Sequence, residues 1–282
     1  MESELNPTRL KLTEFPLTSI NIRWGNVTHA TFRQITIDEG LDFLRPAPSL
    51  EYYRVSMYEP QENEDIGFIN PILHPRLRSL DLSTDCLQHV LEVINVPSLE
   101  EWEQDRGGEP RVAAMLSLLE RSGCCLKILN LDDLPPPDED IETLLQAIPS
   151  LEHIQLSSSW LFGNRTIIDV ILTRTFLSVP TISVENPTSE SFLPHLRFIE
   201  CRTDRFASLV SWGYIPELYR HGHRQSLTLK GFAHESDITD QTALQLLQLT
   251  DEGVDLQIVD LTKGGNFLEN FRNRNRKGKE SL

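Results

Sequence analysis

The sequence predicts an α/β protein assembled from repeated strand–helix units, and three observations support this fold class. A stretch that reads Pro, any residue, Leu and a charged residue recurs, as in PSLEYYRV at residues 48–55 and PSLEHIQL at residues 149–156. Apolar residues then occupy the first, fourth and sixth places of each stretch. The copies follow one another at intervals in the twenties, and amphipathic segments lie between them.

Each copy predicts a short strand with one buried face. The fourth and sixth places lie on the same side of a strand because side chains alternate, and the residue between them is usually polar. The copy at Leu77, for example, continues with Leu80, Asp81 and Leu82. The leading apolar residues of the copies are Val27, Leu50, Leu77, Leu99, Leu126, Leu151 and Leu196.

The spacing of the copies indicates the architecture. The first five intervals between leading residues are 23, 27, 22, 27 and 25 residues, which is typical of a leucine-rich repeat. The last interval, from Leu151 to Leu196, is 45 residues. We therefore expect one degenerate repeat between them, in FLSVPTISV at residues 176–184.

The segments between the strands predict helices. Apolar residues at i, i+3, i+4 and i+7 form one stripe in residues 87–94, 112–119 and 141–148, and the same pattern begins at Phe206. Gly123 is placed to end the second of these helices. Near the end of the chain, TALQLLQLTDEG at residues 242–253 predicts a helix and VDLQIVDL at 254–261 a last strand.

Together these units predict a leucine-rich-repeat solenoid, with a curved parallel sheet on its concave side and helices on its convex side. We expect the repeat domain to span residues 1–265, with about eight to ten irregular repeats. Residues 266–282 include the basic run RNRNRKGK and predict a disordered tail. Whether this tail is a nuclear-import signal stays open from the sequence.

Composition excludes several classes of partner and compartment. The formal net charge of −16 argues against binding to nucleic acid or to an anionic membrane. The chain begins MESELNPTRL without an apolar signal segment, and no run is long enough to span a bilayer. Its four cysteines form no CxxC pair and predict reduced thiols. We expect a monomer in the cytoplasm or nucleus.

The sequence contains no motif that predicts catalysis. It lacks the glycine-rich phosphate loops, the nucleophile elbow and the HExxH zinc motif. His221 and His223 are two potential metal ligands without a nearby third. We therefore expect no enzyme activity, no metal and no cofactor.

The concave face is the predicted binding site, because repeat proteins present their strands there and aromatic side chains favour protein contacts. We expect an unidentified protein ligand on this face. The side chains predicted to contact it are Tyr52, Arg54, Asp81, Glu101, Glu103, Asn130, His153, Gln155, Phe198 and Glu200.

Three stretches carry a resemblance to a known family. PRLRSLDLST, LLERSGCCLKILNLDDLPPPDEDIETLLQAIPSLEHIQLSS and FLPHLRFIECRTDRFASLV resemble the leucine-rich C-terminal half of F-box proteins from mushroom-forming fungi. The likeness runs from about residue 7 to residue 265. In that family an N-terminal F-box docks on a ubiquitin-ligase adaptor, and the repeats hold the substrate. No F-box segment is found in this sequence.

The resemblance implies a protein-binding repeat domain similar to the substrate-recognition part of a ubiquitin-ligase subunit. If an F-box lies upstream, a ubiquitin-ligase adaptor is a second expected partner. The alternative keeps the fold and changes the role, to a leucine-rich-repeat scaffold or inhibitor that acts without ubiquitin. The sequence does not identify the ligand or say whether the chain is a truncated F-box protein.

Overall fold

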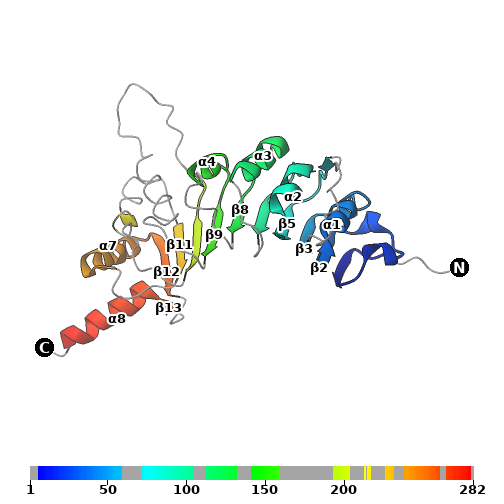
Figure 1. The fold of residues 1–282 in the computed structure, drawn as a ribbon. Coiled ribbons are helices and arrows are strands. Elements are labelled where there is room, and N and C mark those ends of the chain that lie inside the picture. Colours follow the sequence, from blue (N-terminus) through cyan, green and yellow to red (C-terminus); the bar gives the residue numbers. More distant parts are fainter. Residues whose placement is uncertain are drawn as a thin grey trace, which may run out of the picture. The chain divides into compact units, whose positions relative to one another are not determined.

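The structure is a computed structural model, shown in Figure 1, and it divides the chain into two compact units, residues 1–140 and 141–282. Each unit is described by itself. The residues that the structure describes are 6–58, 71–104, 112–131, 141–158, 193–203, 213, 215–216, 226–231, 238–260 and 265–280. The prediction of one repeat domain over 1–265 stays a prediction.

The first unit alternates strands with helices. Its strands are β1 (Arg9–Thr13), β2 (His29–Thr36), β3 (Tyr52–Tyr58), β4 (Ile72–Leu73), β5 (Ser79–Ser83), β6 (Ile94–Asn95), β7 (Glu101–Gln104) and β8 (Ile128–Leu131). Its helices are the 3-10 turns η1 (Leu17–Ser19) and η2 (Trp24–Asn26), and α1 (Ile37–Leu44), α2 (Leu87–Val93) and α3 (Val112–Ser122).

The strands of the first unit form a parallel sheet. Within its described residues the order is β1, β2, β3, β5, β7, β8, and every neighbouring pair is parallel. The short strands β4 and β6 pair separately, also in parallel. Parallel pairing of successive strands requires a crossover each time, and α1, α2 and α3 lie in three of these crossovers. The predicted α/β class with a parallel sheet is therefore confirmed.

The recurring Pro-x-Leu stretch forms a tight turn before several of the strands. The amide of Leu50 donates to the carbonyl of Ala47 over 3.1 Å, and the amide of Leu99 donates to Val96 over 3.0 Å. Proline takes the second place of this turn because its fixed φ suits that position. The leading residues of the seven copies are all buried, with at most 2 % of their surface exposed.

The charged residue after each leading leucine lies where the strands begin. The carbonyl of Glu51 accepts the amides of Arg78 and Ser79, and the same paired contact recurs at each strand up to Lys127. Along the sheet these residues alternate in sign, from Glu51 through Arg78 and Glu100 to Lys127. The Lys127 Nζ lies 3.4 Å from a carboxylate oxygen of Glu100. Unlike charges on neighbouring strands favour this register modestly.

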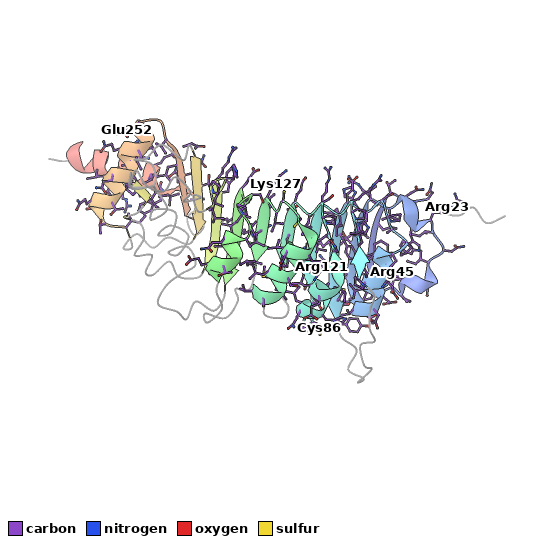
Figure 2. All side chains as sticks on the ribbon, turned by 90° about the horizontal axis from the view of Figure 1, so that it is seen from above. Arg23, Arg45, Cys86, Arg121, Lys127 and Glu252 are labelled. Carbon is purple, nitrogen blue, oxygen red and sulfur yellow. The ribbon has the colours of Figure 1, made fainter. Side chains whose placement is uncertain are left out.

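The helices of the first unit cover one face of its sheet, as Figure 2 shows. Strand side chains that point toward them form the core, including Phe32, Tyr53, Leu80, Trp102 and Leu129, which are at most 2 % exposed. The opposite side, which we call the open face, carries Arg9, Lys11, Thr13, His29, Thr31, Arg33, Tyr52, Arg54, Ser56, Ser79, Asp81, Ser83, Glu101, Glu103, Ile128 and Asn130.

Polar contacts at the helix ends fix α1 and α3. Thr36 and Glu39 form a reciprocal capping box at the start of α1. As predicted, Gly123 ends α3: it has a φ of 56° and its amide donates to Leu119 over 2.8 Å. From α3, the Arg121 guanidinium (labelled in Figure 2) donates to the carbonyl oxygens of Leu91 and Ile94 at the end of α2.

The second unit has the same alternation in its described residues. Its elements are α4 (Ile141–Gln146), β9 (His153–Ser158), β10 (Phe198–Thr203), β11 (Ser226–Gly231), α7 (Asp240–Asp251), β12 (Asp255–Asp260), β13 (Gly265–Asn266) and α8 (Phe267–Glu280). Strands β9, β10, β11 and β12 are parallel neighbours, and β13 closes this order as an antiparallel strand.

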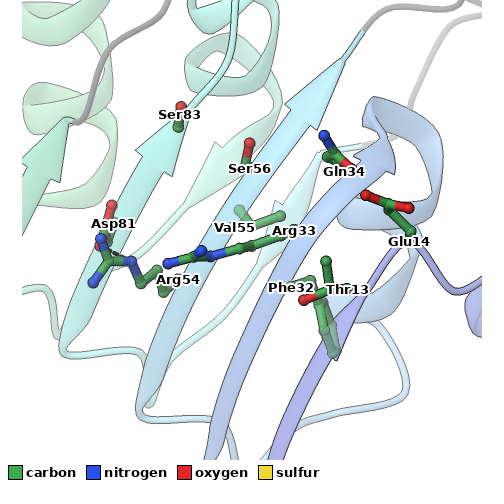
Figure 3. Close-up of a pocket in the computed structure, with 10 residues that line it drawn as sticks. All are labelled: Thr13, Glu14, Phe32, Arg33, Gln34, Arg54, Val55, Ser56, Asp81 and Ser83. Carbon is green, nitrogen blue, oxygen red and sulfur yellow. Dashed lines mark ion pairs between the residues drawn. The ribbon is translucent and has the colours of Figure 1, made fainter.

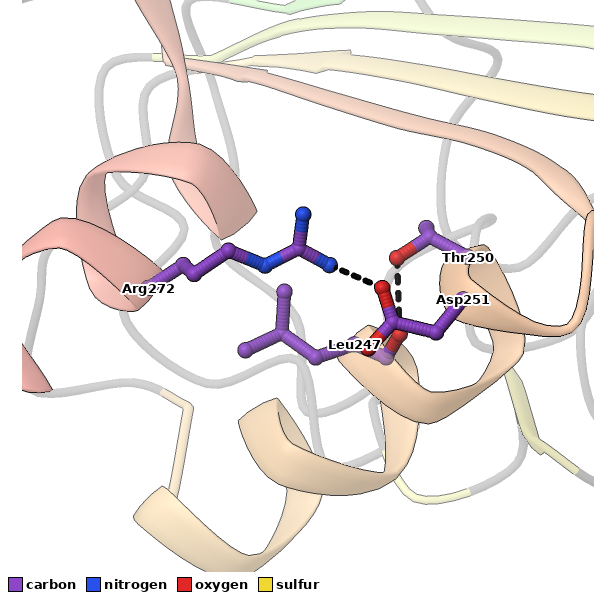
Figure 4. Close-up of polar contacts among 4 residues, drawn as sticks. All are labelled: Leu247, Thr250, Asp251 and Arg272. Carbon is purple, nitrogen blue, oxygen red and sulfur yellow. Dashed lines mark hydrogen bonds and ion pairs between the residues drawn. The ribbon is translucent and has the colours of Figure 1, made fainter. Parts of the chain in front are cut away.

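The basic C-terminal segment forms helix α8, which differs from the disordered tail that its composition predicts. Phe267, Leu268 and Phe271 are buried, so the segment contributes an apolar stripe to the unit. Figure 4 shows Arg272 of α8 paired with Asp251 at the end of α7, where Thr250 donates to the Leu247 carbonyl over 2.7 Å. Burial of these three apolar side chains stabilises a helix, although the basic composition of the segment predicts disorder.

The predicted helices at residues 87–94, 112–119, 141–148 and 242–253 are confirmed, as are the strand after each leading residue and the last strand. Residues 176–184, Phe206 and the histidine pair His221 and His223 lie outside the described residues. Among the described cysteines, Cys125 is exposed and Cys86 and Cys124 are half-buried, and all three are free thiols. None of the helices in the described segments is long and apolar enough to cross a membrane.

Candidate functional site

Side chains of the open face stand in rows, because neighbouring strands pair in register. One row runs through Arg9, His29, Tyr52, Ser79, Glu101 and Ile128. The next row runs through Lys11, Thr31, Arg54, Asp81, Glu103 and Asn130. The first unit thus gathers six of the predicted site residues, Tyr52, Arg54, Asp81, Glu101, Glu103 and Asn130, on one face.

The charges of the open face are sorted by strand. On β1, β2 and β3 the charged members are all cations, namely Arg9, Lys11, Arg33 and Arg54. On β5 and β7 they are all carboxylates, namely Asp81, Glu101 and Glu103. A partner that lies across these strands therefore meets a basic surface and then an acidic one, which favours one orientation of binding.

The boundary between the two halves is an ion pair. The Arg54 Nε lies 2.8 Å from Asp81 Oδ2, and the Asp81 side chain is only 3 % exposed while that of Arg54 is 39 % exposed. The contact of Asp81 with a partner stays a prediction. In the unbound chain the Asp81 carboxylate holds the partly exposed Arg54 guanidinium against the sheet.

Tyr52 is half-buried beside this pair. Its ring stacks on His29 of the neighbouring strand, with centroids 5.9 Å apart. Burial raises the pKa of the Tyr52 hydroxyl above its ordinary value of 10.0, and the Asp81 carboxylate raises the pKa further. Tyr52 therefore stays protonated near neutral pH and offers a donor to a ligand.

The remaining predicted residues of this unit differ in accessibility. Glu101 and Glu103 are half-buried and lie beside each other on β7, at alternate positions. Asn130 is also half-buried, and its side-chain oxygen is a buried acceptor for which the described residues provide no hydrogen-bond donor. Unsatisfied buried acceptors are costly, and this oxygen has too little accessible surface for a bound partner to reach it directly.

The other four predicted residues, His153, Gln155, Phe198 and Glu200, lie in the second unit. His153 of β9 and Phe198 of β10 are paired in register, and their rings lie 5.6 Å apart. Phe198 is 45 % exposed, which agrees with a contact role, and Gln155 is half-buried. Glu200 is buried, with 8 % of its surface exposed, and its contact with a partner stays a prediction.

A pocket of about 400 Å³ opens where strands β1, β2, β3 and β5 end, and Figure 3 shows its lining. The residues around it are mainly polar: Thr13, Glu14, Arg33, Gln34, Arg54, Ser56, Asp81 and Ser83, with Phe32 and Val55. The Arg33 side chain extends across β3 toward Arg54, whereas Glu14 lies on the far side of Gln34. The pocket thus has a guanidinium-rich side and a separate acidic rim.

The rim of the pocket has unusual backbone geometry. Glu14 and Gln34 adopt φ values of 54° and 56°, a conformation that non-glycine residues rarely take. Gln34 is the extra residue of a bulge, because the pairing of β2 with β3 shifts between Arg33 and Ile35. The bulge lets Arg33 and Gln34 both face solvent while Ile35 stays in the core. Bulges of this kind redirect side chains near binding sites.

Sequence reasoning missed Arg33, Glu14 and Gln34. One signal was present: THATFRQITI alternates until Arg33 and Gln34, where two polar residues stand together. Such a break in alternation is typical of a bulge. The positive φ of Glu14 has no comparable signature.

Comparisons with known proteins leave the site to be interpreted from its own geometry. No protein-family model matches the chain, and neither the curated proteins nor the solved structures gave a match.

Proposed function

We propose that the chain is a protein-binding domain in which leucine-rich repeats stack as a solenoid, with the open face on its concave side. It acts by binding rather than by catalysis, and it resembles the substrate-recognition part of an F-box ubiquitin-ligase subunit. The support is the recurrence of one unit: a buried leading residue, a proline turn and a strand parallel to its predecessor.

The charge-sorted open face is the observation that carries the binding role. Cations on three adjacent strands and carboxylates on the next two make a strongly directional surface, and half-buried Tyr52 adds an aromatic contact at its centre. Maintaining like charges side by side is unfavourable for the isolated protein. A macromolecule with the opposite arrangement of charges offsets this cost and is the partner that the face fits.

Affinity capture from cell extract with matched variants tests this function. The first variant carries Glu101→Lys and Glu103→Lys on the open face. The control carries Glu92→Lys on α2 and Glu120→Lys on α3, where both carboxylates are exposed on the helix side. The two variants undergo the same change in net charge, so a general effect of charge is the same for both.

We expect the wild-type chain and the control to retain the same proteins, and the open-face variant to lose them. Circular dichroism establishes that all three samples are folded. Recovery of the same proteins with all three chains, or of none with any, would contradict a binding role for this face.

Binding to a ubiquitin-ligase adaptor distinguishes a ligase subunit from a scaffold or inhibitor. The coding sequence upstream of Met1 is first searched for an F-box, and the longest chain that it encodes is mixed with a purified ubiquitin-ligase adaptor. Co-elution of the two in gel filtration supports a ligase subunit. Separate elution favours the scaffold or inhibitor, which keeps the captured partners and needs no adaptor.

A further inference from the structure

The pocket at the ends of β1, β2, β3 and β5 has a charge that is not neutralised internally. Arg54 and Asp81 form a close pair and leave little net charge on that wall. Arg33 is different: its side chain is exposed, and none of the described residues gives it a hydrogen-bond or ion-pair partner. Figure 3 shows this guanidinium reaching over β3 into the pocket.

The surroundings of Arg33 supply further donors for an anion. Ser56 of β3 is the residue paired with Arg33 across the sheet, and its hydroxyl lines the same pocket. The charged side chains of the open face on β1 to β3 are all cations. A guanidinium beside a hydroxyl on a basic surface matches an oxyanion, because Arg binds two oxygens of a carboxylate or phosphate with parallel donors.

The backbone holds these donors in place before any ligand arrives. The bulge at Gln34 keeps Arg33 on the open side, and the Glu14 amide donates to the Arg33 carbonyl over 3.0 Å. Both rim residues adopt a positive φ, a backbone conformation that is strained for a non-glycine residue. Strain of this kind persists where the surrounding structure enforces it, and it often marks a binding site.

We propose that this pocket is an oxyanion-binding subsite, in which Arg33 and Ser56 hold a phosphate or carboxylate group against the wall formed by Arg54 and Asp81. The Glu14 carboxylate on the opposite rim repels a second negative charge and limits the subsite to one anionic group. The anionic group can belong to the protein partner or to a free anion. Only the first case rests on the proposed function, and binding of a free anion does not require it.

Titration of the full chain with inorganic phosphate and with acetate, at constant ionic strength set by NaCl, tests the subsite. Isothermal calorimetry supplies the dissociation constant, and the melting temperature supplies a second readout. The key variant is Arg33→Gln. Its matched control is Lys11→Gln, which removes the same charge from the open face outside the pocket lining.

We expect saturable binding of at least one of the two anions by the wild-type chain. Arg33→Gln weakens this binding by at least about tenfold, since a charge-assisted bond of about 1.5 kcal/mol or more is lost. Ser56→Ala weakens it by a few-fold, Glu14→Gln strengthens it, and Lys11→Gln changes it by less than about twofold.

Capped peptides that carry one phosphoserine or one aspartate distinguish the source of the group. Tighter binding of a peptide than of the free ion assigns the subsite to a protein partner, and equal binding assigns it to a free anion. Equal losses in Arg33→Gln and Lys11→Gln, or no saturable binding by the folded wild-type chain, would overturn the proposal. Neither result affects the capture experiment, which depends on Glu101 and Glu103.

Discussion

Arg54 and Asp81 meet across adjacent parallel strands, with 2.8 Å between the Arg54 Nε and Asp81 Oδ2. The carboxylate is almost completely buried and the guanidinium is partly exposed. Asp81 therefore depends on Arg54 for stabilisation of its charge, because a buried carboxylate without a cation is strongly unfavourable. The stability of the sheet and the arrangement of side chains on its open face therefore both depend on this pair.

The first prediction is that Arg54→Met lowers the free energy of unfolding by roughly 2 kcal/mol. The loss is smaller than for a fully buried ion pair because Arg54 is partly exposed. Urea unfolding followed by circular dichroism measures the loss. Arg33→Met is the matched control on the neighbouring strand, and we expect a change within about 0.5 kcal/mol. A similar loss in both variants would show that the methionine, rather than the broken pair, is responsible.

The second prediction concerns buried His74. Its Nε2 lies 2.9 Å from the Ala47 carbonyl oxygen, so this nitrogen carries the proton. Its Nδ1 is then a buried acceptor, and the described residues offer it no donor. Burial lowers the pKa of His74 below its ordinary 6.5, although the bond to Ala47 opposes this in part.

Because its folded pKa lies below its unfolded pKa, His74 does not favour the folded state in acid. Above about pH 6.5 both states are neutral. As the pH falls further, the unfolded chain takes up a proton that the folded chain does not, and stability decreases until the folded pKa is passed. Urea unfolding at several pH values between about 7 and 5 gives the free energy of unfolding as a function of pH. This free energy should fall less steeply with decreasing pH for His74→Gln than for the wild type. The same pH dependence in both proteins would show that protonation of His74 does not destabilise the folded chain.

The third prediction concerns Arg121, which connects α3 to the end of α2. Its guanidinium donates to the carbonyls of Leu91 and Ile94, two groups that a helix end leaves without internal partners. Arg121→Met should lower the free energy of unfolding by about 1–3 kcal/mol. Arg121→Lys should recover only part of the loss, because an ammonium lacks the planar set of donors.

Differential scanning calorimetry measures these losses, and Lys127→Met supplies the control. Lys127 pairs with Glu100 at the exposed edge of the sheet, where an ion pair contributes about 0.5 kcal/mol or less. Full recovery of stability by Arg121→Lys would indicate that charge alone, rather than the bonds to both carbonyls, stabilises the helix end.

Much of the fold could be predicted because each unit depends on local pattern. Leucine at the first, fourth and sixth places, with proline before the first, specifies a turn and a half-buried strand within ten residues. The helices of residues 87–93 and 112–122 follow for the same reason. Helix α1 at residues 37–44 was missed: its apolar residues adjoin β2 without a turn signal, and its Thr36 cap also ends that strand.

The site was predictable only in part, since alternation indicates which side of a strand a residue faces but not how deeply it lies. It identified Tyr52, Glu101 and Glu103 as members of one face, yet it could not show that Asp81 is covered by Arg54. The pocket depends on a bulge and on two positive φ angles, which arise from the packing of β1 and β2. Such features are set by tertiary context rather than by local composition.

The last prediction separates a docked helix from a charged tail at residues 267–280. The Phe271 side chain is 8 % exposed, so Phe271→Ala should lower the free energy of unfolding by about 3 kcal/mol. Arg272→Ala should cost at most about 1 kcal/mol, because its partner Asp251 is largely exposed and water screens the pair. Asn273→Ala, at an exposed position of the same helix, is the control and should stay within about 0.5 kcal/mol of the wild type.

Hydrogen exchange of the α8 amides provides the complementary readout. A helix that packs through Phe267 and Phe271 protects its first turns from exchange, and Phe271→Ala removes that protection while strands β9 to β12 keep theirs. Unprotected amides in the wild type, together with an unchanged stability of Phe271→Ala, would mean that the positive charges of this segment dominate over its apolar stripe. In that case the basic run would be accessible to a receptor, and the import signal left open by the sequence would become the better explanation of its charge.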